Sequence, residues 1–194
     1  TLERRPAETL AFGRIWVERQ ARFCATDWIA VPGGFLTIHG RRIDLHRFER
    51  SNAFPGPSLY FHERAIERRQ ARADAASLLA DTQFLETVYA VLPAWGMHRM
   101  GNQKAKVVAF DLMVASFRSM AEPIQALWQR NITAIADDEV AQVGDQVWRI
   151  IAGLQVSQSE TRIVAGSKAL HHVLPDLVPP IDRQYTFRFF TGQK

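Results

Sequence analysis

The chain has 194 residues, of which 47% are hydrophobic and 23% are charged, a composition typical of a folded globular domain rather than a disordered chain. Its single cysteine, Cys24, excludes an internal disulfide and a multi-cysteine zinc site. The longest apolar stretch contains Asp111 and is too short to cross a bilayer, so we expect no membrane span and a cytoplasmic location. The net charge of +4 permits binding to phosphate groups, but a GC-rich genome would produce the same excess of arginine without any nucleic-acid partner, and we favour that explanation.

The first part of the chain predicts one helix and one β-hairpin. Apolar residues at loosely helical spacing favour a helix over residues 7–23. Alternating residues on either side of a glycine-containing turn favour a small β-hairpin within residues 28–48. The proline- and glycine-rich stretch at residues 51–58 then predicts a loop that connects the hairpin to a helical body.

The rest of the chain predicts a series of helices. Residues 60–72 are dense in glutamate and arginine at three- and four-residue spacings, which indicates an exposed helix with opposite-charge pairs; a nucleic-acid patch is the alternative. Asp81 or Thr82 is expected to cap the next helix, which ends or kinks near Pro93. Further helices are expected over residues 107–120, 123–130, 137–154, 167–173 and 182–190, with a capping box at residues 157–160.

Sequence motifs of several common enzyme classes are absent. The chain has no P-loop, no dinucleotide-binding Gly-x-Gly-x-x-Gly pattern and no nucleophile elbow. His171 and His172 are adjacent, so on a helix their side chains point about 100° apart and would not hold one metal ion together. We therefore expect no metal site and no bound cofactor. The predicted fold class is mainly α, with a single helical domain over residues 1–194.

Two stretches mix residue types that an ordinary core does not require: Trp95-Gly96-Met97-His98-Arg99, and Gly166-Ser167-Lys168 followed by Pro179-Pro180-Ile181-Asp182-Arg183-Gln184-Tyr185. Together they resemble an uncharacterised family of bacterial helical proteins with a Trp-Gly-Met-x-Arg stretch and a Ser/Thr-Lys stretch followed by Pro-x-x-Asp-Arg. The second stretch also resembles, more distantly, the helix-hairpin-helix DNA glycosylases. In those proteins a glycine-rich hairpin leads into a lysine, and a later aspartate opens another helix. The chain lacks the Gly-x-Gly of that hairpin, and the resemblance implies a fold more than a reaction.

The resemblance implies a site near the C-terminal end of the chain, with DNA as the partner. Gly166 and Ser167 would offer backbone N–H groups to a phosphate at a helix start, with Lys168 beside them. Asp182 would act with Lys168 as the catalytic pair, either as a base for water or by stabilising positive charge on a sugar. The remaining candidate site residues are Trp95, Arg99, His171, Arg183 and Tyr185.

Several of these residues also have a structural explanation, and Lys168 is typical of a solvated lysine at a helix start. Asp182 follows two prolines and an isoleucine and precedes a helical segment, which is typical of an N-cap. Trp95 is typical of core packing, Gly96 of a helix end in a left-handed conformation, and Arg99 of a buried ion pair. Two other functions therefore stay open: a non-enzymatic helical interaction module, and an enzyme that acts on a small anionic substrate.

Overall fold

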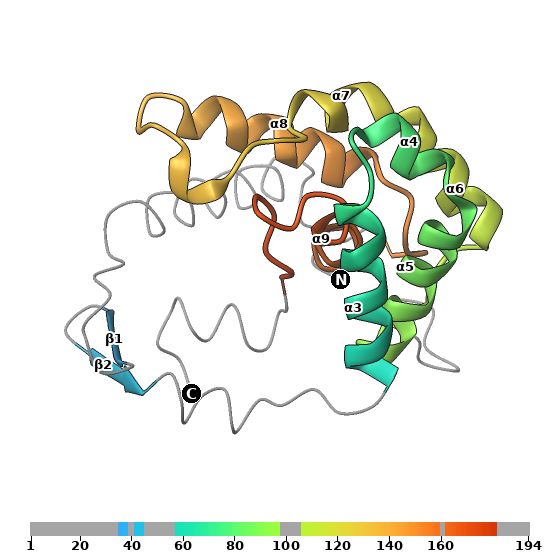
Figure 1. Cartoon of the computed structure of the whole chain (residues 1–194), viewed down its shortest axis with the longest axis horizontal. Helices are drawn as coiled ribbons and strands as arrows, with labels where there is room; N and C mark the ends of the chain where they lie inside the picture. Colours follow the sequence, from blue (N-terminus) through green and yellow to red (C-terminus); the bar gives the residue numbers. More distant parts are fainter. Residues whose placement is uncertain (1–34, 39–40, 45–56, 98–105, 160–161, 182–194) are drawn as a thin grey trace, which may run out of the picture. The chain divides into compact units, whose positions relative to one another are not determined.

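The computed structural model describes residues 57–97, 106–159 and 162–181, together with the backbone of residues 35–38 and 41–44. In these residues the protein is mainly α-helical, as the sequence predicts (Figure 1). Residue contacts divide the chain into two units, one formed by residues 1–55 and 131–148 and the other by residues 56–130 and 149–194. None of the helices in the described ranges is long and apolar enough to span a membrane.

The described residues of the first unit form two strands, a short 3-10 helix and the beginning of one α-helix. Strand β1 (Phe35–Ile38) pairs antiparallel with β2 (Arg41–Asp44). The 3-10 helix η2 spans Ile132–Ala134. Helix α8 (Val140–Gly153) begins in this unit and ends in the second. The helix predicted over residues 7–23 lies outside the described residues.

The second unit is built from helices that pack around one another. Helix α3 packs along α5, α5 also contacts α4, α6 and α9, and α4 packs against α6 and α7. Figure 1 shows α3 lying beside α5. In chain order these helices are α3 (Pro57–Gln70), α4 (Ala75–Ala80), α5 (Thr82–Ala94), α6 (Phe110–Ser119), α7 (Ala121–Ala126), the end of α8, and α9 (Ile163–His171).

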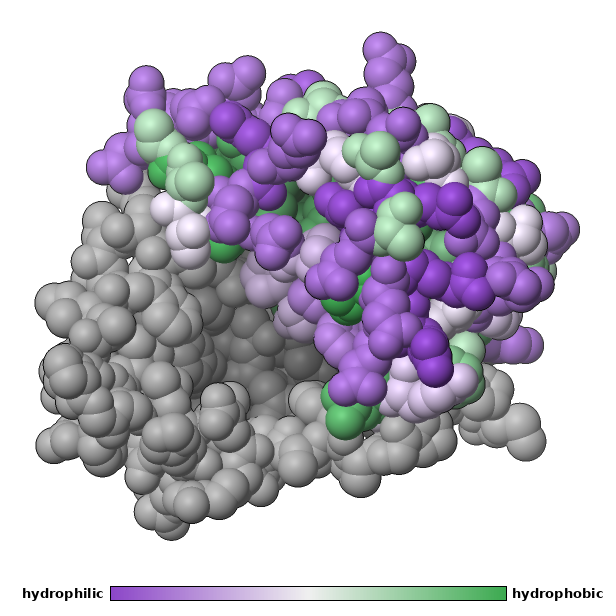
Figure 2. All heavy atoms as spheres, in the orientation of Figure 1, coloured by the Kyte–Doolittle hydropathy of each residue, from purple (hydrophilic) through white to green (hydrophobic). Residues whose placement is uncertain are grey.

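The core side chains recur at helical spacing, because one stripe of each helix turns away from water. Burying one valine, leucine, isoleucine or phenylalanine side chain stabilises the folded state by roughly 1.5–3 kcal/mol. On the face shown in Figure 2, hydrophilic residues cover most of the described surface, and apolar residues form small separate patches. The buried residues of α5 are Phe84, Leu85, Val88, Val91 and Leu92, and those of α8 include Val140, Val143, Val147, Ile150 and Ile151, as predicted.

Several predicted boundaries are wrong. Residues 107–109 are extended rather than helical, because Val107 forms an antiparallel bridge with Ser157 and Val108 donates its amide to the carbonyl oxygen of Val156 at 3.1 Å. Ser157 therefore belongs to an extended pair and does not cap the following helix. Helix α4 has no counterpart among the predicted elements. The predicted loop at residues 51–58 is too long at its C-terminal end, because α3 begins at Pro57.

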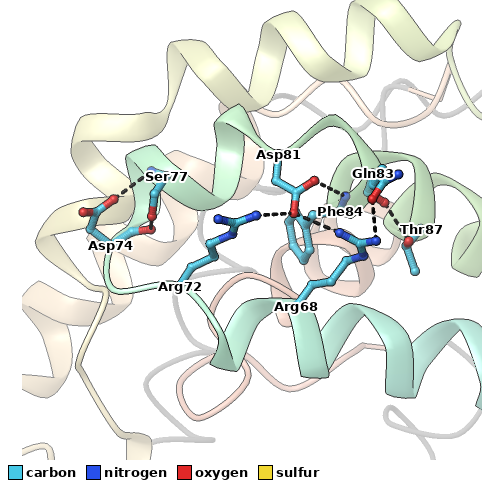
Figure 3. Close-up of polar contacts among 8 residues, drawn as sticks. All are labelled: Arg68, Arg72, Asp74, Ser77, Asp81, Gln83, Phe84 and Thr87. Atoms are coloured by element: carbon cyan, nitrogen blue, oxygen red, sulfur yellow. Dashed lines mark hydrogen bonds and ion pairs between the residues drawn. The ribbon is translucent and has the colours of Figure 1, made fainter.

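Asp81 connects the charged helix α3 to the start of α5 (Figure 3). Its Oδ1 accepts the amide of Phe84 at 3.2 Å, which confirms that Asp81 is the N-cap of α5. Its Oδ2 accepts hydrogen bonds from Arg72 at 2.9 Å and Arg68 at 3.1 Å. Burial by itself would raise the pKa of Asp81, but the hydrogen bonds from Arg72, Phe84 and Arg68 outweigh it and lower the pKa. Two arginines of the charged run therefore have a structural role.

Replacing Asp81 by alanine is expected to lower the free energy of unfolding by about 2 kcal/mol, because a helix cap and two ion pairs are lost together. Asp74 is the matched control, since it caps α4 through the Ser77 amide at 2.7 Å and forms no ion pair within the described residues. Asp74→Ala should cost about 1 kcal/mol. Chemical denaturation measures both values, and equal losses would contradict the role assigned to the arginines.

Candidate functional site

Four aromatic side chains gather in the second unit, and we call them the ring cluster: His62, Trp95, His171 and His172. His62 lies on α3, Trp95 is the C-cap of α5, His171 is the last residue of α9 and His172 is its C-cap. The six distances between their ring centroids lie between 5.0 and 6.3 Å. The His172 side chain is fully buried, whereas the other three residues keep part of their surface exposed.

The end of α5 presents a backbone carbonyl to Lys168. Gly96 has a φ of +79°, and the Met97 amide donates to the Leu92 carbonyl at 3.0 Å. This is a Schellman motif, and it confirms the prediction that Gly96 ends a helix in a left-handed conformation. The Nζ of Lys168 donates to the carbonyl oxygen of Trp95 at 3.1 Å, although only 7% of Lys168 is exposed. Lys168 thus joins α9 to the end of α5.

Hydrogen bonds determine which ring nitrogen of each histidine carries hydrogen. A backbone carbonyl can only accept, so the Nδ1 of His172 donates to the Lys168 carbonyl at 2.8 Å. The Nε2 of this neutral ring is then an acceptor, and the Nδ1 of His62 donates to it at 3.2 Å. The Nδ1 of His171 donates to the Val178 carbonyl at 2.8 Å. The Nε2 atoms of His62 and His171 therefore carry lone pairs, and neither has a hydrogen-bond partner within the described residues.

Burial keeps the three imidazoles uncharged near neutral pH. Removal from water lowers the pKa of His171 to about 4 and the pKa of His172 to about 3. Burial also lowers the pKa of His62, against the opposing effect of Glu63. Since an unperturbed histidine has a pKa of about 6.5, none of the three rings is a cation at pH 7. The ring cluster is therefore a set of neutral hydrogen-bonding groups.

Gly166 and Ser167 lie inside α9 rather than at its start. The helix begins at Ile163, and the Gly166 amide donates to the Arg162 carbonyl at 2.8 Å. The expected helix start with a free amide at Gly166 is therefore wrong. A Cβ atom at Gly166 would lie 3.0 Å from Cγ2 and 3.2 Å from the carbonyl oxygen of Ile151, so the glycine permits close contact with the end of α8.

Ser167 forms a hydrogen bond between α9 and the segment that follows it. Its side chain is fully buried, donates to the Val164 carbonyl at 3.2 Å and accepts the Ile181 amide at 3.0 Å. Of the candidate site residues, Trp95 contacts both the Lys168 side chain and the His171 ring. The candidate residues Arg99, Asp182, Arg183 and Tyr185 lie outside the described residues.

His62 and Arg69 are the residues of this region that the sequence did not single out. They are seven residues apart on α3, so they lie on the same face of the helix. The guanidinium carbon of Arg69 lies 3.3 Å from the Trp128 ring centroid, and its Nε donates to the Val173 carbonyl at 2.7 Å. The seven-residue spacing is a sequence signal that His62 and Arg69 share one face of a helix. The many charged residues around them indicated an exposed helix instead.

Comparison with family models, curated proteins and solved structures found no match for this chain. In the part of the chain that the structure describes, no group of three or more His, Cys, Asp or Glu side chains could hold a metal ion. The site is therefore characterised by its own geometry. It consists of neutral imidazoles and an indole beside the nearly buried amine-bearing side chain of Lys168.

Proposed function

We propose that the protein binds DNA on a glycosylase-like helical fold, and that Asp182 carries the hydrolytic chemistry at a nucleotide beside the ring cluster. One observation supports this proposal. The Ile181 amide is hydrogen-bonded to the Ser167 side chain at 3.0 Å, so the residue that precedes Asp182 is attached to α9 next to Lys168. The resemblance of residues 166–185 to the helix-hairpin-helix DNA glycosylases agrees with this arrangement of a lysine and a later aspartate.

The contacts of Lys168 change the role that we assign to it. Because Lys168 is 7% exposed and donates to the Trp95 carbonyl, it holds the site together from within and does not extend to an exposed phosphate. We therefore assign the hydrolytic step to Asp182 alone, as the base for water or as the group that stabilises positive charge on a sugar. The net charge of +4 favours approach to the DNA backbone.

The full chain is expected to bind DNA with an affinity that falls as salt is raised, because bound phosphates release counterions. Fluorescence anisotropy with a labelled duplex, a single strand and a duplex that contains an abasic site would measure it. The logarithm of the binding constant should fall linearly with the logarithm of the salt concentration, by about 0.9 for each phosphate neutralised on duplex DNA. Absence of binding to all three DNAs at low salt would refute the proposal.

Asp182→Asn separates catalysis from binding in the same assay. The variant should keep its DNA affinity and its melting temperature but lose base or sugar release from DNA. Asp176→Asn is the matched control, because Asp176 is an exposed carboxylate in the same segment and should leave both properties unchanged. A lower melting temperature for Asp182→Asn, without any hydrolysis by the unsubstituted protein, would assign Asp182 to a helix cap instead.

A second candidate, a non-enzymatic interaction module, is favoured by two contacts. The bond from Lys168 to the Trp95 carbonyl joins α9 to the end of α5, and the bond between His62 and His172 joins α3 to α9. In such a module both motifs serve only to hold helices together. The DNA titration distinguishes the two functions, because the module would show no salt-dependent affinity for DNA.

A further inference from the structure

We propose that the partly exposed rings of His62 and His171, with the indole of Trp95, form a binding face for a nucleobase that carries an exocyclic amino group. This inference rests on the proposed function and names the part of DNA that the ring cluster recognises. It concerns three residues, of which His62 has no place in either sequence motif.

The three members of the ring cluster other than His172 keep part of their surface exposed. His172 is fully buried, and its ring centroid lies 5.0–5.3 Å from those of the other three rings, so they surround it. The rings of His62 and His171 are nearly parallel, with an angle of 5° and centroids 5.6 Å apart. Planar aromatic faces of this kind stack on nucleobases, and such stacking tolerates any base.

Selection among bases would come from the two Nε2 lone pairs. The Nδ1 of His62 donates to His172, and the Nδ1 of His171 donates to the Val178 carbonyl. Moving the hydrogen of either ring to Nε2 would break one of these bonds, so both Nε2 atoms are fixed as acceptors. An exocyclic amino group of adenine or cytosine offers two N–H donors. The binding face therefore favours a base that carries hydrogen-bond donors at this position. A base with an acceptor there cannot form the hydrogen bonds to the two Nε2 atoms.

The absence of charge on the rings favours a base over a phosphate as the ligand. Burial lowers the pKa of His171 to about 4, and the pKa of His62 is also lowered, so at pH 7 neither ring attracts an anion as an imidazolium would. The phosphate backbone would instead be bound by cationic side chains elsewhere on the protein. The ring cluster and those cationic side chains would thus recognise different parts of one nucleotide.

Adenosine and purine riboside provide the test, because they differ only in the exocyclic amino group. Titration of the full chain, followed through the histidine ring nitrogens by NMR, should show at least about tenfold tighter binding of adenosine, as expected for two added hydrogen bonds. The largest shifts should appear at the Nε2 atoms of His62 and His171. His171→Phe should remove the preference for adenosine. Tyr60→Phe, on an exposed residue of α3, is the control and should retain it.

Equal affinity for the two nucleosides would overturn the inference. NMR spectra that show hydrogen on the Nε2 of His62 or His171 would also overturn the inference. These spectra are recorded on the unsubstituted protein, so the test does not depend on the folding of a variant. Salt-dependent DNA binding without discrimination between the nucleosides refutes only this inference. Discrimination between the nucleosides without DNA binding refutes the proposed function, and the face then serves free nucleosides.

Discussion

Lowering the pH from 7 to 5 is expected to reduce the free energy of unfolding by about 4 kcal/mol through His171 and His172 alone. The unfolded chain takes up protons at these residues near their ordinary pKa of about 6.5. The folded protein does not, because burial lowers the pKa of His171 to about 4 and of His172 to about 3. The unfolded state thus binds more protons in this window, so stability falls as the pH falls.

Chemical denaturation at a series of pH values measures this loss. The stabilisation should be complete above about pH 7.5, where both states are neutral at these residues, and should decline as the pH falls through about 6.5. His172→Phe should show a slope about half as steep, because one of the two titrating rings is gone. An unfolding free energy that stays constant between pH 7 and 5 would show that the histidines are accessible to protons in the folded state.

Replacing Gly166 by leucine is expected to lower the free energy of unfolding by about 3 kcal/mol, because α9 would be forced away from the end of α8. Even a single added carbon would lie 3.2 Å from a backbone carbonyl oxygen of Ile151, and backbone cannot move aside as a side chain does. Chemical denaturation would measure the change, with circular dichroism to confirm retained helix content.

Gly153→Ala is the matched control for this substitution. A Cβ atom at Gly153 would meet only the thioether end of Met120, which is flexible and can shift. The change in stability should therefore stay within about 1 kcal/mol. A loss at Gly166 no larger than the loss at Gly153 would mean that α8 and α9 do not approach as closely as the structure shows.

The mainly α-helical fold was predictable where one helix face is buried along its whole length. In α8 the apolar residues recur every three or four positions, and all of Val140, Val143, Val147 and Ile150 are buried. The cap of α5 was predictable for a similar reason, because Asp81 is a residue type whose side chain accepts backbone amides. Helix α4 was not predicted because six residues are too few to show a period.

The details of the candidate site were less accessible to sequence reasoning. Helix α9 follows Arg162, which forms no side-chain cap, so the usual polar signal for a helix start is missing and the start was placed too late. His62 is 110 residues from His172, and no local pattern indicates a hydrogen bond over that separation. The prediction that His171 and His172 point apart did not anticipate that both rings contact His62, nor that the two rings lie edge to face with centroids 5.3 Å apart.

At Gly96 the backbone conformation, and not the space around the residue, restricts which amino acids fit. A Cβ atom there would have no neighbour within 4 Å, so open space surrounds the residue. An L-amino acid would nevertheless strain the backbone at a φ of +79°, whereas a D-amino acid adopts that angle readily. D-alanine would therefore fit at this position and L-alanine would not, and the helix end that supplies a carbonyl to Lys168 depends on the one achiral amino acid.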